Sequence, residues 1–110
     1  MLFRSMRPSG RTYVLSLTTA ASSALQIVPT TNDQTNYVCL MATGTDVCAV
    51  ELAPESANLL TPAIASTGNG GSFVVLPNMR IVIAAPKGPF YIQAISGGTN
   101  TLYITPVQAD

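Results

Sequence analysis

Short runs of apolar residues recur about every ten positions along this 110-residue chain, with turn-forming residues between them. The runs are rich in Val, Ile, Leu, Tyr and Thr, which suit a pleated, half-buried strand. The separators contain Gly, Pro, Asn or Asp, which set or tolerate the backbone angles of turns. The pattern predicts eight strands, at residues 12–17, 23–28, 37–42, 47–53, 72–76, 79–84, 90–95 and 101–105.

Helical periodicity is nowhere sustained over ten residues. The best helical candidate, residues 56–64, is bracketed by Pro54 and Pro62, so we expect one turn at most. The longest segment without a strand, residues 53–71, is predicted to cross from one sheet to another.

Alternation within the runs predicts which side chains face the core. Arg80, Gln93 and Glu51 each mark the outward face of their strand, because successive side chains point to opposite faces. Met79 is expected to point inward with Ile81. The predicted core comprises Leu15, Leu17, Cys48, Val50, Ile81, Ile83, Phe90, Ile92, Leu102 and Ile104. The same alternation leaves Val82, Tyr91, Ile95 and Tyr103 on outer faces, and exposed apolar surface of this extent is typical of an interface.

These strands predict an all-β fold, an antiparallel two-sheet sandwich of about eight strands, of jelly-roll or immunoglobulin-like type. One domain suits a chain of 110 residues. We assign residues 12–110 to the sandwich and residues 1–11 to an extended N-terminal arm.

Charge is scarce, and this narrows the classes of function. The chain has five Lys and Arg, five Asp and Glu, and no histidine, while 47% of it is hydrophobic. A net charge of zero provides no long-range field to steer the chain to nucleic acid or anionic lipid. There is no apolar run long enough to span a membrane and no apolar core of a signal peptide at the start, so we expect synthesis in the cytosol. Without histidine, the commonest proton-transfer group is missing. We therefore expect a binding protein with no cofactor and no catalytic residues.

An enzymatic alternative depends on Glu51 and Glu55. Paired carboxylates carry out glycoside hydrolysis, but no histidine and no aromatic platform accompanies this pair. Solvated surface is the favoured interpretation of both residues.

Cys39 and Cys48 are expected to flank a hairpin and to share one face of it, because side chains alternate with a period of two. Two free thiols buried in the core and a cross-strand disulfide both remain open. A zinc site needs more ligands than two cysteines provide in a chain without histidine.

Three of the five positive charges, Arg4, Arg7 and Arg11, fall within the first eleven residues. Three arginines without interleaved aromatics are weak evidence for nucleic-acid binding, whose affinity grows with the number of phosphates neutralised. The segment is either a solvated terminus or an arm that pairs with an acidic protein surface, for which the planar guanidinium is well suited.

Several motifs resemble the small β-sandwich structural proteins of tailed bacteriophages. They are Tyr-Val-Leu-Ser-Leu at 13–17, the segment Asn-Tyr-Val-Cys-Leu-Met-Ala-Thr-Gly-Thr-Asp-Val-Cys-Ala-Val-Glu-Leu at 36–52, Gly-Ser-Phe-Val-Val-Leu-Pro at 71–77, Gly-Pro-Phe-Tyr-Ile-Gln-Ala-Ile-Ser at 88–96 and Asn-Thr-Leu-Tyr-Ile-Thr-Pro at 100–106. The resemblance spans residues 12–106 and implies a virion component, often a capsid decoration or cement protein.

On this resemblance we expect a decoration protein on the capsid exterior, made in the host cytoplasm. Its partners would be the major capsid protein and further copies of itself, as a homodimer or homotrimer, with no direct contact to nucleic acid or membrane. The expected contact residues are Arg4, Arg7, Arg11, Tyr91 and Tyr103. The alternative is a tail or head-fibre component that binds a host receptor or glycan.

Overall fold

The computed structural model describes residues 6–29, 36–86 and 88–109. These residues form nine strands and one 3-10 turn. Their bounds are β1 Met6–Pro8, β2 Tyr13–Leu17, β3 Leu25–Ile27, β4 Asn36–Thr43, β5 Cys48–Ala53, η1 Ser56–Asn58, β6 Phe73–Val75, β7 Arg80–Ala84, β8 Phe90–Ser96 and β9 Asn100–Ala109. All eight predicted strands are present, and the single turn η1 agrees with the prediction of one helical turn at most. Within the described ranges no helix is long and apolar enough to cross a membrane.

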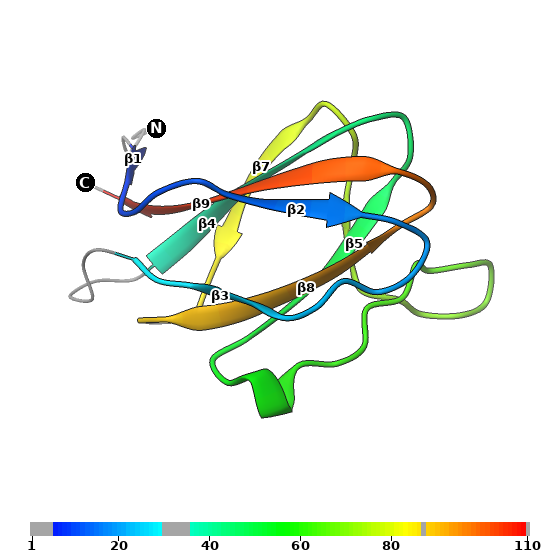
Figure 1. Cartoon of the computed structure of the whole chain (residues 1–110), viewed down its shortest axis with the longest axis horizontal. Coiled ribbons are helices and arrows are strands. Elements are labelled where there is room, and N and C mark those ends of the chain that lie inside the picture. Colours follow the sequence, from blue (N-terminus) through cyan, green and yellow to red (C-terminus); the bar gives the residue numbers. More distant parts are fainter. Residues whose placement is uncertain (1–5, 30–35, 87, 110) are drawn as a thin grey trace.

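The strands form two antiparallel sheets packed as a sandwich, which confirms the predicted fold class (Figure 1). Sheet A has the order β1-β9-β4-β7, and β2 also pairs with β9; sheet B has the order β3-β8-β5-β6. Because β4 occupies one edge of β9, both β1 and β2 lie along its other edge and act as one interrupted strand. If β1 and β2 are counted as one strand, the first strand of the chain pairs with the last. The strand order in both sheets is then that of a jelly roll.

The core lies between the sheets and contains every residue predicted for it. Seven of those ten side chains are buried, and Leu15, Ile81 and Ile83 pack against the buried cluster. The cluster also includes Ile27, Val38, Leu40, Ala42, Val75 and Ala94. The inward orientation predicted for Met79 is wrong, because this side chain lies just before β7 and is 58% exposed.

The predicted hairpin between the two cysteines is also wrong. Strand β4 belongs to sheet A and β5 to sheet B, so residues 44–47 connect the sheets instead of closing a hairpin. Cys48 is fully buried, whereas Cys39 is only half-buried on the outer face of sheet A. Both cysteines are free thiols. Their separation on two faces of the fold excludes the disulfide that the sequence left open.

The long segment after β5 does not cross between sheets as predicted. It joins β5 to β6, which are neighbours in sheet B, whereas the short β4–β5 connection is one of those that cross between the sheets. Stacked sheets lie roughly 10 Å apart, and an extended residue spans about 3.3 Å, so a few residues suffice.

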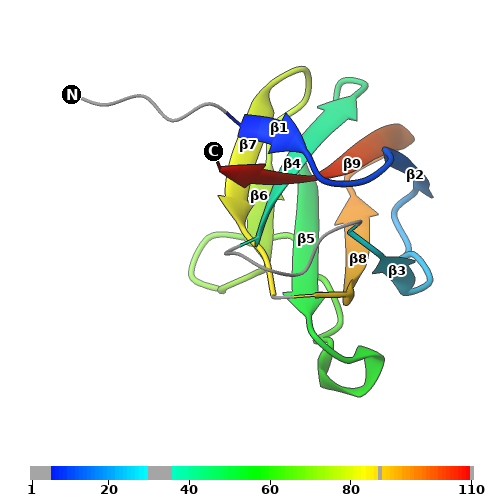
Figure 2. The same cartoon turned by 90° about the vertical axis from the view of Figure 1, so that its left-hand side faces the viewer.

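The segment predicted as an arm includes a strand. Residues 1–5, with Arg4, lie outside the described residues, but β1 pairs with the last residues of β9, with Arg7 opposite Gln108 (Figure 2). The Ser9 backbone N–H donates to the Pro106 carbonyl at 2.8 Å, which continues this pairing beyond the strand. Residues 6–8 therefore belong to sheet A.

A tight corner closes one end of the sandwich around Gly44. This glycine has φ +138°, in a region that other residues rarely adopt. The buried Asn100 side chain lies directly against it, so a Cβ at position 44 would collide with Asn100 Oδ1. Asn100 Nδ2 in turn donates to the Asp46 carbonyl and to Cys48 Sγ. Gly44 thus allows Asn100 to connect the corner to the core.

Replacing Gly44 with Ala is expected to lower the free energy of unfolding by about 1–3 kcal/mol, since it combines backbone strain with a collision against a buried amide. Urea denaturation measures the loss. Gly70→Ala is the matched control, because no atom lies within 4 Å of the new Cβ and no positive φ is involved; it should change stability by less than about 0.5 kcal/mol. Equal losses in the two variants would contradict this view of the corner.

Candidate functional site

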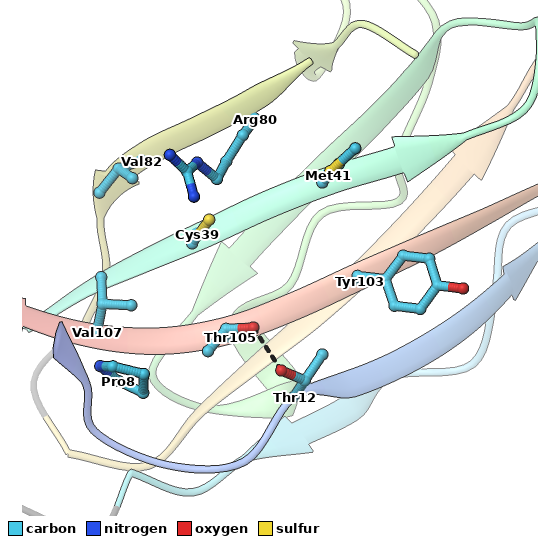
Figure 3. Close-up of a pocket in the computed structure, with 9 residues that line it drawn as sticks. All are labelled: Pro8, Thr12, Cys39, Met41, Arg80, Val82, Tyr103, Thr105 and Val107. Atoms are coloured by element: carbon cyan, nitrogen blue, oxygen red, sulfur yellow. Dashed lines mark hydrogen bonds between the residues drawn. The ribbon is translucent and has the colours of Figure 1, made fainter. Parts of the chain in front are cut away.

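A hollow lies on the outer face of sheet A. It is an open groove of about 670 Å³. Its lining consists of Pro8, Thr12, Cys39, Met41, Arg80, Val82, Tyr103, Thr105 and Val107 (Figure 3). We refer to these nine residues as the sheet A groove.

Strand register builds the groove from alternate residues of neighbouring strands. Residues directly opposite in antiparallel strands share a face. Tyr103 on β9 is opposite Met41 on β4, and Met41 is opposite Arg80 on β7. Two residues away on each strand, Thr105 is opposite Cys39, and Cys39 is opposite Val82. The groove is therefore fixed by the same pairing that places the intervening residues in the core.

Arg80 is the one charged residue in the groove lining, which is otherwise apolar or hydroxyl-bearing. Figure 3 shows its guanidinium turned toward Cys39 and Val82. None of the described residues forms an ion pair or a hydrogen bond with this guanidinium. A carboxylate from a bound partner would meet an unpaired cation that provides several N–H donors in a planar fork.

The Cys39 thiol lies between the apolar wall and this cation. Burial raises the pKa of the thiol above its ordinary value, and the nearby positive charge of Arg80 acts in the opposite direction. Because the thiolate is the nucleophile, Cys39 is a poor nucleophile at neutral pH, and its contribution to the groove is packing surface.

The polar atoms of the groove are few. Thr12 and Thr105 form a hydrogen bond with each other, with 2.8 Å between their hydroxyl oxygens. Tyr103 is 40% exposed and presents its ring at the end of the groove (Figure 3). The lining contains no carboxylate, no carboxamide and no histidine.

The five contact residues predicted from sequence do not form one site. Tyr103 lies in the sheet A groove, whereas Tyr91 is half-buried on the outer face of sheet B, opposite Gln26 and Ala53. Arg11 is exposed between β1 and β2. Arg4 lies outside the described residues, and Arg7 is described only as part of the β1 backbone. The contact roles of the five residues remain predictions from sequence, but Tyr91 cannot contribute to a contact made by the outer face of sheet A, because it lies on the opposite outer face.

Cys39 and Met41 were not predicted from the sequence as groove residues. Strand β4 is apolar on both faces, with Val38, Leu40 and Ala42 buried and Tyr37, Cys39 and Met41 facing outward. Alternation therefore gave no sign of which set faces the core. Arg80 and Val82 were predicted to face outward. Their partners on β4, Met41 and Cys39, could have been assigned to the same outer face if the strand pairing had been known.

Glu51 and Glu55 lie away from the groove. Glu51 is opposite Gln93 on the outer face of sheet B, and Glu55 is exposed just before η1. Among the residues described, no group of three or more His, Cys, Asp or Glu side chains is close enough to hold a metal ion.

Comparisons with protein-family models, with curated proteins and with solved structures found no match to this chain.

The two thiols are expected to differ in reactivity. In the native protein, iodoacetamide should modify Cys39 and leave the fully buried Cys48 untouched until the chain unfolds. The alkylation rate of Cys39 should rise with pH, with a midpoint above that of a free cysteine because the pKa is raised. Arg80→Leu should move this midpoint higher, since it removes the charge that lowers the pKa. Peptide mass spectrometry across a pH series measures both effects.

Arg11→Leu is the control for the Cys39 experiment, because Arg11 is an exposed arginine that does not line the groove. It should leave the midpoint unchanged. A downward shift in Arg80→Leu, or modification of Cys48 at the same rate as Cys39, would contradict the geometry of the groove.

Proposed function

We propose that this chain is a structural protein of a bacteriophage virion, a decoration or cement protein that binds the outer face of the major capsid protein shell. The sheet A groove would be the contact surface, with Arg80 and Tyr103 as its principal contact residues. The arm arginines Arg4, Arg7 and Arg11 would add contacts to acidic surface on the same partner.

The observation that carries this proposal is the groove itself: a largely apolar sheet face with one unpaired cation and with no carboxylate or histidine in its lining. Such a face suits burial against another protein, because aromatic and arginine side chains dominate the energetics of interfaces. The jelly roll is compatible with this function, since viral capsid domains use it, but lectins and cupins use it as well. The fold alone therefore does not identify the function.

The groove chemistry favours a protein partner over a glycan. A polar ligand is oriented by several placed polar groups, whereas this lining provides two threonine hydroxyls that already bond each other, one tyrosine and one arginine. The tail or head-fibre role with receptor or glycan binding remains the alternative.

The copy number in the virion separates the decoration role from the tail role. Quantitative mass spectrometry of purified virions should give a ratio of this chain to the major capsid protein near one or a simple fraction of it. A handful of copies per virion would indicate the tail.

Binding to capsid shells provides the direct test of the groove. Shells assembled from the major capsid protein of the same genome should co-sediment with the purified chain. Tyr103→Ala and Arg80→Glu should each weaken binding about tenfold or more, equivalent to roughly 1.4 kcal/mol. The measurement is the fraction bound across a concentration series.

Tyr91→Ala is the matched control for the shell-binding experiment, because it removes a tyrosine from the opposite outer face. It should bind as the unmodified chain does. Weaker binding in Tyr91→Ala with normal binding in Tyr103→Ala would move the contact to sheet B, and a chain that never binds shells would contradict the decoration role.

A further inference from the structure

Exposed apolar side chains gather at one side of the sandwich. Of the ten large apolar side chains that the described residues leave exposed, five lie within residues 73–82, in β6, β7 and the turn between them. These are Phe73, Val74, Leu76, Met79 and Val82. Three residues of this segment, Val74, Leu76 and Met79, line a second depression of about 150 Å³ together with Arg80 and Ile81. This concentration is typical of a surface that a partner covers.

Strand β7 is an open edge of sheet A. It pairs with β4 on one side, and none of the described residues pairs with its other side (Figure 2). None of its five residues is fully buried, even though Ile81 and Ile83 face the core. The inward residues of the neighbouring β4, Val38 and Leu40, are by contrast completely buried.

The other sheet edges carry features that block strand addition, and β7 does not. The opposite edge of sheet A is interrupted between β1 and β2 and contains Pro8. In sheet B, the edge strands β3 and β6 are only three residues long. Short strands, breaks and prolines are devices that prevent edge-to-edge pairing. β7 has five residues, no proline and an apolar centre at Val82.

We propose that β7 pairs antiparallel with β7 of a second copy of this chain, so that sheet A continues across a twofold axis at Val82. In this register Val82 lies opposite its own copy, Ile81 opposite Ile83 of the second copy, and Arg80 opposite Ala84. All five residues of each strand are then paired. Inward residues meet inward residues, so the two cores become continuous at the junction.

Charge selects this register. A strand rises about 3.4 Å per residue, so the two Arg80 side chains are held about 14 Å apart along the strands, beyond the Debye length of about 8 Å. Centring the axis on Ile81 would bring them to about half that distance, and centring it on Ile83 would bring Pro86 opposite Arg80. The Val82 register is the one that pairs the whole strand and separates the cations.

This self-association goes beyond the proposed virion role and does not depend on it. The dimer would present two sheet A grooves side by side on one continuous face. Two linked contacts bind a repeating partner surface more tightly than one.

A charged residue at position 82, on the proposed twofold axis, tests the dimer in solution. The purified chain should sediment as a dimer. Val82→Lys should raise the dimer dissociation constant at least tenfold, because two lysines would then lie directly opposite each other. Val14→Lys is the matched control, since Val14 is an exposed valine of the same sheet face on β2, away from the β7 edge. It should remain dimeric.

Disulfide trapping tests the register and does not depend on the stability of the lysine variants. Directly opposite residues have Cα atoms about 4.5–5.5 Å apart, within the range that a disulfide bridges. Cys39 must first be replaced with Ser, because it lies opposite Val82 within one chain. Cys39→Ser/Val82→Cys should give a covalent dimer on mild oxidation, whereas Cys39→Ser/Ala84→Cys should not, since residue 84 would face Arg80.

Each of the following results would overturn the twofold β7 pairing. They are a monomer up to several hundred micromolar, a trimer, equal cross-linking at positions 82 and 84, and a Val14→Lys variant that dissociates as readily as Val82→Lys. Circular dichroism on every variant confirms that the sandwich is folded before its assembly is compared.

Discussion

Strand β9 is the element on which both the core and the groove depend. It pairs with β4 along one edge and with β1 and β2 along the other. Alternation then assigns its residues to two tasks: Leu102 and Ile104 are completely buried between the sheets, while Tyr103 and Thr105 face the groove. A slip of one residue would exchange these two sets. Stability and contact surface are therefore specified by one register.

Scarcity of charge makes the few charged positions informative. The sheet A groove is lined by apolar side chains, hydroxyls and one charged group, the unpaired Arg80 guanidinium. The groove therefore favours a partner that brings a negative charge. Two of the described carboxylates, Glu51 and Glu55, lie on or beside sheet B. The two outer faces therefore differ in charge, because the groove on sheet A contains a cation and no carboxylate. A molecule of this kind can present chemically different faces to a partner and to solvent.

Much of the fold could be predicted from the sequence because most strands are marked by a polar residue on one face. Arg80, Glu51 and Gln93 identified the outward side of their strands, and the core prediction followed from them. Strand β4 has no such marker, so the orientation of Cys39 was predicted incorrectly. The pairing of strands that are far apart in the sequence cannot be predicted from a local pattern. Strand β9 contacts β4 and β2, which both lie far from it along the chain. The groove forms only when these strands are adjacent.

In an assembled virion, the outer face of sheet A should be the face of this protein that is covered. Hydroxyl-radical footprinting of purified virions, compared with the free chain, tests it at the level of single side chains. Met41 and Tyr103 should be protected from oxidation in the virion, while Tyr91 on the outer face of sheet B should be modified as in the free chain. Protection of Tyr91 with Met41 and Tyr103 still open to modification would contradict the account.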